Sequence, residues 1–292
     1  MPKIYHEALR PLGNLGIQVS TAALDNPHVP LHWHEAMEIL FCLNGEATVH
    51  VDHEVISLPR NRLIVFDSKE VHAIHSTSKI YMFLCIHIDK KLLSLYFPDL
   101  ELYSIKCRPL PLDDPKFTEY LNLCQLAREL TRINVENEST SAMRSDGTAL
   151  LMLSDLIKYF SVSASPGSIS IQRQPNDTIR EIISYVTEHY KEKITLDQMA
   201  ARTGFSREYF CRFFKQHMGI TFLRYLNEVR ISHAGRLLNT TELSIFDIMA
   251  ESGFTNQTLF NQMFKEIYGI TPRQARKLNK AHSTSENIPL FL

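Results

Sequence analysis

The chain has 292 residues, of which 44% are hydrophobic, and its formal net charge is −1. This length allows two ordinary domains, each with its own core, and the near-neutral charge excludes a protein coated evenly in basic residues. The charge is nevertheless uneven, because residues 1–176 carry −4 and residues 177–280 carry +4. That sign suits a phosphate-binding module joined to an acidic one.

The five cysteines show no CxxC spacing, and the N-terminus lacks the apolar stretch of a signal peptide. No segment approaches the roughly 18 apolar residues that a membrane span needs. We therefore expect reduced thiols and a cytoplasmic protein that has no membrane partner.

Residues 15–90 are predicted to form β-structure. Their β-prone runs are short and are separated by turn residues such as Asn44-Gly45. The runs are 38–43, 47–51, 55–58, 63–66 and 81–88. Short strands at this spacing predict a small barrel or sandwich, which we place within residues 1–108.

Helical periodicity follows in residues 115–132 and 142–160, on either side of the polar segment Asn134–Ser141. This pattern predicts a helical hairpin within residues 109–162. Its apolar faces either pack on the barrel or form the seam of a dimer.

Residues 163–176 are rich in Ser, Pro and Gly and are predicted to be an interdomain linker. Beyond it, residues 177–280 are predicted to form an all-α domain, followed by a tail over residues 281–292. The leading helix of that domain is expected to start at a capping box of Thr178 with Glu181.

Two segments within the predicted all-α domain, residues 195–221 and 244–271, resemble each other. Each contains the parts of a helix-turn-helix unit: a capped first helix, a glycine at the turn and a capped second helix. Gly204 and Gly253 fall where the turn needs a positive φ. The caps expected at the four helix starts are Thr195, Ser206, Ser244 and Thr255.

Polar side chains are left on the outward face of each second helix. They are Arg207, Glu208 and Arg212 in the first unit and Asn256, Gln257, Thr258, Asn261 and Gln262 in the second. Arginine can bind guanine through two hydrogen bonds, and Asn or Gln can bind adenine. A solvated helix face would look similar, but the polar positions match in two copies. A long amphipathic helix predicted over 221–240 would hold the two second helices about 34 Å apart, the spacing of successive major grooves.

The segments GFSREYFCRFFKQHMGITFLRYLNEVRISHAGRLL and IMAESGFTNQTLFNQMFKEIYGITPRQAR resemble the C-terminal domain of AraC/XylS-type transcription regulators. The resemblance implies that two recognition helices enter adjacent major grooves of DNA. It places the base-contacting positions of the family on the outward residues above, Asn256 excepted. Because Gln262 stands where the family often has Arg, we expect the first recognition helix to dominate affinity.

The N-terminal half contains HWHEAMEILFCLNG at residues 32–45. His32 and His34 are two apart, so on a strand they point to the same face, and Glu38 and His72 could converge on them. The pattern resembles the first cupin motif, with His72 near the histidine of the second. Three histidines and a carboxylate can bind a divalent transition metal.

This half also resembles the sensing barrel of AraC/XylS-type regulators, which usually holds a small effector such as a sugar and no catalytic metal. We therefore predict that His32, His34, Glu38 and His72 line an effector pocket, and that no cofactor is needed. A bound metal and purely structural histidines are the alternatives left open. Aromatic residues that could stack on an effector or belong to the core are Trp33, Tyr81 and Phe83.

The predicted fold class is α+β and multidomain, with a cupin-like β-barrel and helical hairpin followed by an all-α domain with two helix-turn-helix units. The predicted function is that of a transcription regulator, an activator, which binds double-stranded DNA and responds to a small-molecule effector. A homodimer and a contact with RNA polymerase are expected, and catalysis is not. The alternative is a cupin metalloenzyme whose helical domain only mediates interactions.

Overall fold

The computed structural model describes residues 16–24, 28–51, 54–76, 78, 80–91, 96–98, 100, 103–136, 138–163 and 175–283. The strands are β1 (Ile17–Leu24), β2 (His28–His32), β3 (Met37–Asn44), β4 (Glu46–Val51), β5 (Glu54–Pro59), β6 (Leu63–Phe66), β7 (His72–His75), β8 (Tyr81–Ile88), β9 (Tyr103–Ile105) and β10 (Ser161–Ser163). The helices are α1 (Phe117–Glu136), α2 (Ser141–Phe160), α3 (Pro175–His189), α4 (Leu196–Thr203), α5 (Arg207–Met218), α6 (Phe222–Thr240), α7 (Ile245–Glu251), α8 (Gln257–Tyr268) and α9 (Pro272–Ser283).

The predicted small barrel or sandwich is present as two antiparallel sheets, ordered β1-β8-β3-β6 and β2-β7-β4-β5. Alternate residues of the central strand β3 face opposite sides, so Leu40 and Cys42 lie in the core between the sheets. Ile39 and Phe41 face the other way, into a second core under the helical hairpin. Burial on both faces explains why this strand is a continuous apolar run.

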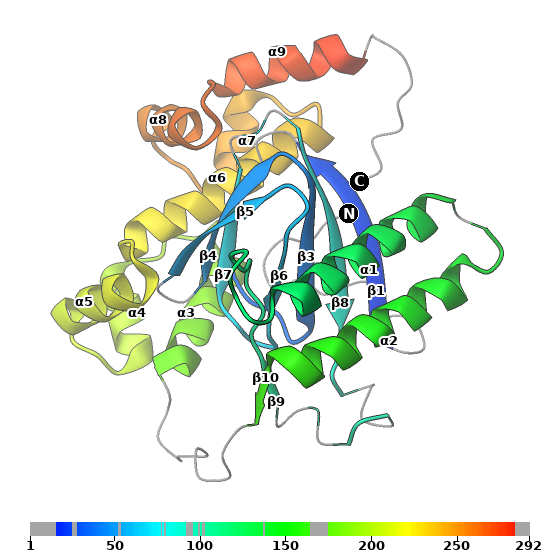
Figure 1. Cartoon of the computed structure of the whole chain (residues 1–292). Coiled ribbons are helices and arrows are strands. Elements are labelled where there is room, and N and C mark those ends of the chain that lie inside the picture. The colour runs from blue at the N-terminus through cyan, green and yellow to red at the C-terminus, as the bar shows by residue number, and fades with distance from the viewer. Residues whose placement is uncertain are drawn as a thin grey trace.

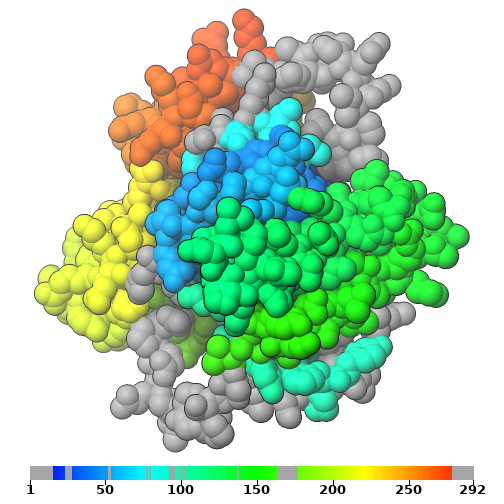
Figure 2. All heavy atoms as spheres, viewed as in Figure 1, coloured from blue at the N-terminus to red at the C-terminus, as the bar shows by residue number. Residues whose placement is uncertain are grey.

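The hairpin of α1 and α2 packs its apolar faces on the first sheet, where both helices contact β1 (Figure 1). In the space-filling view the hairpin covers this side of the molecule (Figure 2). Tyr120 of α1 is fully buried, and its hydroxyl accepts from the Leu63 amide and donates to the Leu63 carbonyl, at 2.9 and 2.8 Å. Of the two expected uses of the hairpin, packing on the barrel is therefore confirmed for its buried faces.

The helical domain runs from α3 to α9, with the long helix α6 between the two helix-turn-helix units (Figure 1). The expected capping box of Thr195 with Gln198 is present, and Gly204 and Gly253 have φ of 74° and 79° as predicted. The expected box at Thr178 is wrong, because α3 starts at Pro175 and Thr178 is buried inside the helix.

The cap predicted at Thr255 is also wrong. The side chain of Asn256 accepts from the Leu259 amide at 3.0 Å and caps α8, whereas Ser206 caps α5 as expected. The turn after Gly253 is one residue longer than the turn after Gly204, so the cap of the second unit lies one residue further along. The sequence places Asn256 among the outward polar residues expected to contact DNA. In the structure its side-chain oxygen instead accepts a hydrogen bond from the backbone of α8.

The structure describes only the two ends of the predicted linker, residues 163–176, and the start of the predicted tail. Ser163, the first residue of the expected linker, is the end of β10, which pairs with β9, and Pro175 already belongs to α3. Residues 164–174 between them lie outside the described residues, as do residues 1–15 and 284–292. Helix α9 continues to Ser283, past the expected end at Lys280.

The helical domain lies against the second sheet, where β2 contacts α6 (Figure 1). Tyr225 of α6 donates a hydrogen bond to the carbonyl of Leu31 at 3.1 Å, and Ser232 donates to the carbonyl of His28 at 3.4 Å. Within the described residues, every helix falls short of the length and apolarity that a bilayer crossing requires.

Candidate recognition helices and histidine cluster

Helix α5 divides its residues between a buried and an exposed face. Phe210, Phe213 and Phe214 are buried in the core of the first helix-turn-helix unit, which fixes how the helix is rotated. The predicted residues Arg207, Glu208 and Arg212 all lie exposed on the opposite face. Arg207 contacts Asp197 of α4 at 3.5 Å, a pair that is too exposed to hold the guanidinium in place against DNA.

Helix α8 repeats this arrangement. Phe260, Met263 and Phe264 are buried, and the predicted residues on the other face are exposed. Those residues are Gln257, Thr258, Asn261 and Gln262. The structure therefore brings both predicted sets to helix surfaces.

Two exposed apolar residues of the recognition helices were missed. Tyr209 is 46% exposed and Leu259 is 37% exposed, and each lies three residues after the cap of its helix. An apolar side chain on a helix is normally expected to face the core, so the sequence did not single them out. At a DNA surface such side chains can contact a thymine methyl group.

Helix α6 fixes the two units relative to each other. Arg224 donates to Glu266 of α8 at 2.7 Å and to Glu228 of its own helix at 2.6 Å. Arg230 donates to the carbonyls of Tyr190 and Glu192, in the loop between α3 and α4, both at 2.8 Å. Polar contacts at both units thus support α6 as the rigid connector that the sequence predicted.

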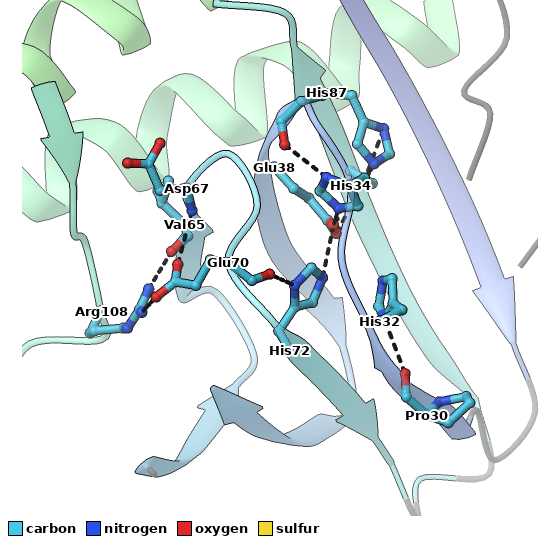
Figure 3. Close-up of polar contacts among 12 residues, drawn as sticks. Pro30, His32, His34, Glu38, Val65, Asp67, Glu70, His72, His87 and Arg108 are labelled. Carbon is cyan, nitrogen blue, oxygen red and sulfur yellow. Dashed lines mark hydrogen bonds and ion pairs between the residues drawn. The ribbon is translucent and has the colours of Figure 1, made fainter. Parts of the chain in front are cut away.

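The second candidate site lies in the sandwich. The structure brings His32, His34, Glu38 and His72 together, with side chains pointing toward one another from β2, the turn after it, β3 and β7 (Figure 3). All four are buried, with exposed fractions of 0–7%. One candidate ligand atom from each residue lies within 4.8 Å of all the others. The predicted convergence is therefore present.

Backbone carbonyls hold the three imidazoles. The Nδ1 atoms of His32, His34 and His72 lie 3.0, 2.7 and 2.9 Å from the carbonyl oxygens of Pro30, Ala36 and Glu70. The opposite ring nitrogens, Nε2, of His34 and His72 face the carboxylate of Glu38 inside the cluster. The ring of His72 also stacks on Phe66, with centroids 3.9 Å apart.

Glu38 lies at the centre of the cluster. Its Oε2 is 2.8 Å from Nε2 of His34 and 3.3 Å from Nε2 of His72. Burial acts to raise the pKa of this carboxyl, but the contacts with these histidines outweigh it and hold the pKa well below its usual range. Burial, followed by the charges of His72 and His34, holds the pKa of His32 well below its usual value. The cluster thus combines an ionised carboxylate with a neutral imidazole.

Two further residues of the cluster were missed. Cys85 Sγ lies 3.3 Å from Oε1 of Glu38, and His87 Nε2 lies 3.8 Å from Oε2. Burial lowers the pKa of His87 to about 4. Both residues occupy inward positions of β8, and His87 pairs in register with Glu38. The alternation in YMFLCIHI contained this signal.

The three aromatic candidates have different surroundings. Tyr81 is buried in the core between the sheets and Phe83 stacks on it, with centroids 5.5 Å apart. Trp33 packs instead against the core of the first helix-turn-helix unit, and its Nε1 donates to the carbonyl of Arg180 at 3.3 Å. Trp33 therefore belongs to the domain contact and does not face the histidine cluster.

Comparison with known proteins agrees with this two-part organisation. Residues 199–278 match the model of a helix-turn-helix domain, and residues 25–87 match that of a cupin domain. The melibiose operon regulatory protein of Escherichia coli strain K12 is 22% identical over 276 residues, which cover 87% of this chain and 86% of that protein. The F1 operon positive regulatory protein of Yersinia pestis is 37% identical over 102 residues, 35% of this chain and 34% of that protein. The solved structure of ToxT from Vibrio cholerae aligns with a TM-score of 0.48 at 16% identity and covers 90% of this chain and 98% of that one.

Proposed function

We propose that this chain is a DNA-binding transcription regulator of the AraC/XylS type, which reads DNA with α5 and α8 and responds to an effector held in its cupin domain. The observation that carries the proposal is the matched pair of recognition helices. Each buries an aromatic face and exposes polar side chains that can reach base edges.

The two helices contribute unequally in this proposal. Helix α5 exposes Arg207 and Arg212, whereas α8 offers mainly amides and a hydroxyl at the corresponding positions. Arginine adds both phosphate attraction and bidentate base contacts, so α5 supplies most of the affinity and α8 adds selectivity.

The test starts with selection of bound sequences from random double-stranded DNA by the full-length protein. On the selected site, Arg212→Ala is expected to weaken binding by about 1–3 kcal/mol, because a bidentate base contact is lost. Gln262→Ala should cost less, and Gln262→Arg should raise affinity. Arg132→Ala on the hairpin helix α1 is the matched control, and fluorescence anisotropy measures all four variants. Unchanged binding by Arg212→Ala on every selected site would contradict a base-reading role.

Two effector classes have support. A sugar or related metabolite is favoured by the melibiose operon regulatory protein, a relative that aligns across both domains. A metal cation is favoured by the chemistry of His32, His34, Glu38 and His72. In either case the cupin domain acts as a sensor and not as an enzyme, in keeping with the curated relatives, which are transcription regulators. A cupin metalloenzyme is the competing hypothesis, and turnover of a substrate would support it.

The remaining partners also belong to the proposal. A second copy of the chain would pack on α2, where Met143 is 79% and Leu151 60% exposed, and sedimentation of the protein with and without Leu151→Glu tests that dimer. Activation through RNA polymerase, in the cytoplasm where the DNA lies, is tested by transcription from the selected site in vitro.

A further inference from the structure

We propose that the contact between Gly235 of α6 and Tyr268 of α8 sets the angle of the second recognition helix, and that this angle selects the spacing between the two halves of the DNA site. The inference rests on the proposed function, because it assumes that α5 and α8 bind DNA together. Gly235 is buried and Tyr268 is half-buried in the core of the second helix-turn-helix unit. Both are therefore positioning residues, which act through α8 and do not touch DNA themselves.

Gly235 is an unexpected residue at its place in the chain. It lies inside the long helix α6, where a glycine destabilises the helix relative to alanine. Its φ is not positive, so the backbone conformation does not require a glycine there. Close approach of another part of the molecule is the remaining reason for a buried helix position without a side chain.

Tyr268 makes that close approach. A Cβ atom at position 235 would lie 2.8 Å from Cζ and 3.2 Å from Cε2 of the Tyr268 ring, and nearer still to its hydroxyl oxygen. Carbon atoms in contact lie about 3.5–4.0 Å apart. The edge of the ring therefore occupies the space that a side chain at position 235 would need, and an alanine there would displace the ring by on the order of 1 Å.

The ring of Tyr268 is also held by its own helix. It packs on Phe264, one turn earlier in α8, with ring centroids 4.7 Å apart, and Phe264 is buried in the core of the second unit. A close-packed core leaves little free space into which the ring could turn. A larger residue at position 235 would therefore either move α8 or force the ring out of its place, and in both cases α8 loses its contact with α6.

A second contact between the same helices lies at a separate point. Arg224 donates to Glu266 of α8 at 2.7 Å. Arg224 and Gly235 are about 16 Å apart along α6, at 1.5 Å per residue. One contact alone would let α8 pivot on α6, whereas two contacts at this separation fix the direction of α8.

Helix α6 belongs to the cores of both units, so the angle of α8 on α6 is also its angle relative to α5. Val229 of α6 packs in the core that anchors α5, and Ile231, two residues later, packs in the core that anchors α8. Gln262 lies about 9 Å from Tyr268 along α8. If α8 turns as a rigid body, a movement on the order of 1 Å at Tyr268 exceeds the few tenths of an ångström within which a hydrogen bond to a base edge keeps its length.

The geometry of DNA makes this angle measurable as a preference for one spacing. One base pair inserted between the two halves of a site moves the second half by about 3.4 Å along the duplex and turns it by about 35°. Two recognition helices held at a fixed angle fit only one such arrangement. A protein in which α8 can pivot should tolerate several spacings and bind each of them more weakly.

The experiment uses the full-length protein and the DNA site selected from random sequences. Four duplexes are compared by fluorescence anisotropy: the selected site, the site with one base pair inserted between its halves, the site with one base pair removed there, and the site with the α8 half scrambled. The α8 half is the one whose base preference changes in Gln262→Ala. The unaltered protein should bind the inserted and shortened sites about tenfold or more weakly than the selected site, since one lost bidentate base contact alone has an effect of this size.

Gly235→Ala should weaken binding to the selected site about tenfold or more, to the level of the site with the scrambled α8 half. Its affinity for that scrambled site should be unchanged, because α5 keeps its contacts. Gly147→Ala is the matched control. Gly147 also lies inside a helix, α2, but a Cβ atom there would have no neighbour within 4 Å, so this variant should bind all four duplexes like the unaltered protein.

Tyr268→Ala distinguishes the contact from a general effect, and it serves as the test if Gly235→Ala does not fold, as judged by circular dichroism. This variant should lose most of the preference for the selected spacing, because α8 then pivots on its contact with Arg224. Gly235→Ala added to Tyr268→Ala should weaken binding by less than about twofold, since the ring that the new methyl group would meet is gone.

Three results would overturn the proposal. Equal affinity of the unaltered protein for all spacings shows that the protein does not select one. An equal loss by folded Gly235→Ala on all four duplexes, or no loss at all, shows that Gly235 does not position α8. Additive losses in the double variant show that Gly235 and Tyr268 act independently. A protein that selects no DNA sequence contradicts the proposed function itself, and thermal unfolding of the same variants then decides whether the two residues are coupled.

Discussion

The turn glycines Gly204 and Gly253 share a backbone conformation but differ in their surroundings. Both have a positive φ, of 74° and 79°, where an L-residue is strained by roughly 1–2 kcal/mol. A Cβ atom at Gly204 would meet open space. At Gly253 it would lie 2.6 Å from the carbonyl oxygen of Tyr190 and 2.9 Å from Cα of Lys191. Position 253 therefore requires a glycine for two reasons: its positive φ, and the close approach of the loop between α3 and α4.

We expect Gly253→Ala to destabilise the helical domain clearly more than Gly204→Ala. The first substitution adds a backbone clash to the strain that both share, and the loop contacted by Arg230 must move to relieve it. Thermal unfolding followed by helical circular dichroism gives the comparison, with the unaltered protein as reference. Equal unfolding temperatures for the two variants would mean that the loop between α3 and α4 moves away from the added methyl group without a loss of stability.

A positive φ at both glycines could be predicted from the sequence, because the turn of a helix-turn-helix unit requires this conformation. The sequence did not predict the contact of Gly253 with Tyr190, because that partner lies on a distant loop whose position depends on the packing of α6. The histidine cluster shows the same limit. Four residues followed from spacing, whereas His87 and Cys85 required the register of β8 against β3.

At the scale of single helices and strands, local sequence patterns were enough to predict most of the elements. The predicted strands and the helices of the hairpin follow from period-2 alternation and helical periodicity, and they agree closely with β3–β6, β8, α1 and α2. Individual strands β2 and β7 did not stand out, because they are short and rich in histidine. Helix starts were predicted well where a capping box existed, as at Thr195. They were missed at α8, where a one-residue insertion moves the cap to Asn256.

Replacement of this cap gives a test at the same scale. Asn256→Ala should destabilise α8 by about 1 kcal/mol, because the Leu259 amide loses its acceptor. Thr255→Ala is the matched control and should change stability by less than half as much, since the Thr255 side chain is exposed and does not cap the helix. Chemical denaturation measures the free energy of unfolding of both variants. A larger loss of stability in Thr255→Ala than in Asn256→Ala would show that Thr255 caps the helix, as the sequence predicted.

At the scale of the whole molecule, the two domains meet where β2 contacts α6. The sequence predicted two domains joined by a linker but contained no local signal for their docking, because the contact joins residues almost 200 positions apart, such as Leu31 and Tyr225. The same contact covers most of His28, whose side chain is 13% exposed and whose Nε2 lies 4.0 Å from Glu228 of α6 and makes no hydrogen bond.

Burial of His28 has a consequence for stability. Burial, followed by the charges of His75, Arg224 and His50, lowers the pKa of His28 from 6.5 to about 3. These groups face it from β7, α6 and β4, and the carboxylate of Glu228, 4.0 Å from Nε2 of His28, does not offset them. His28 is therefore neutral in the folded protein over the whole range in which a histidine in an unfolded chain gains its proton.

We expect the folded protein to lose stability as the pH falls below 6.5. His28 of the unfolded chain then binds a proton, whereas His28 of the folded protein stays neutral. Between pH 7 and pH 5 the loss from this residue should be about 2 kcal/mol, from 1.5 pH units at 1.36 kcal/mol each. His28→Gln should flatten that part of the pH profile, whereas His189→Gln, at the C-terminal end of α3 and away from the domain contact, should leave it intact. Urea denaturation at a series of pH values measures the difference. Parallel profiles for the His28 variant and the unaltered protein would show that His28 takes up its proton without disturbing the domain contact.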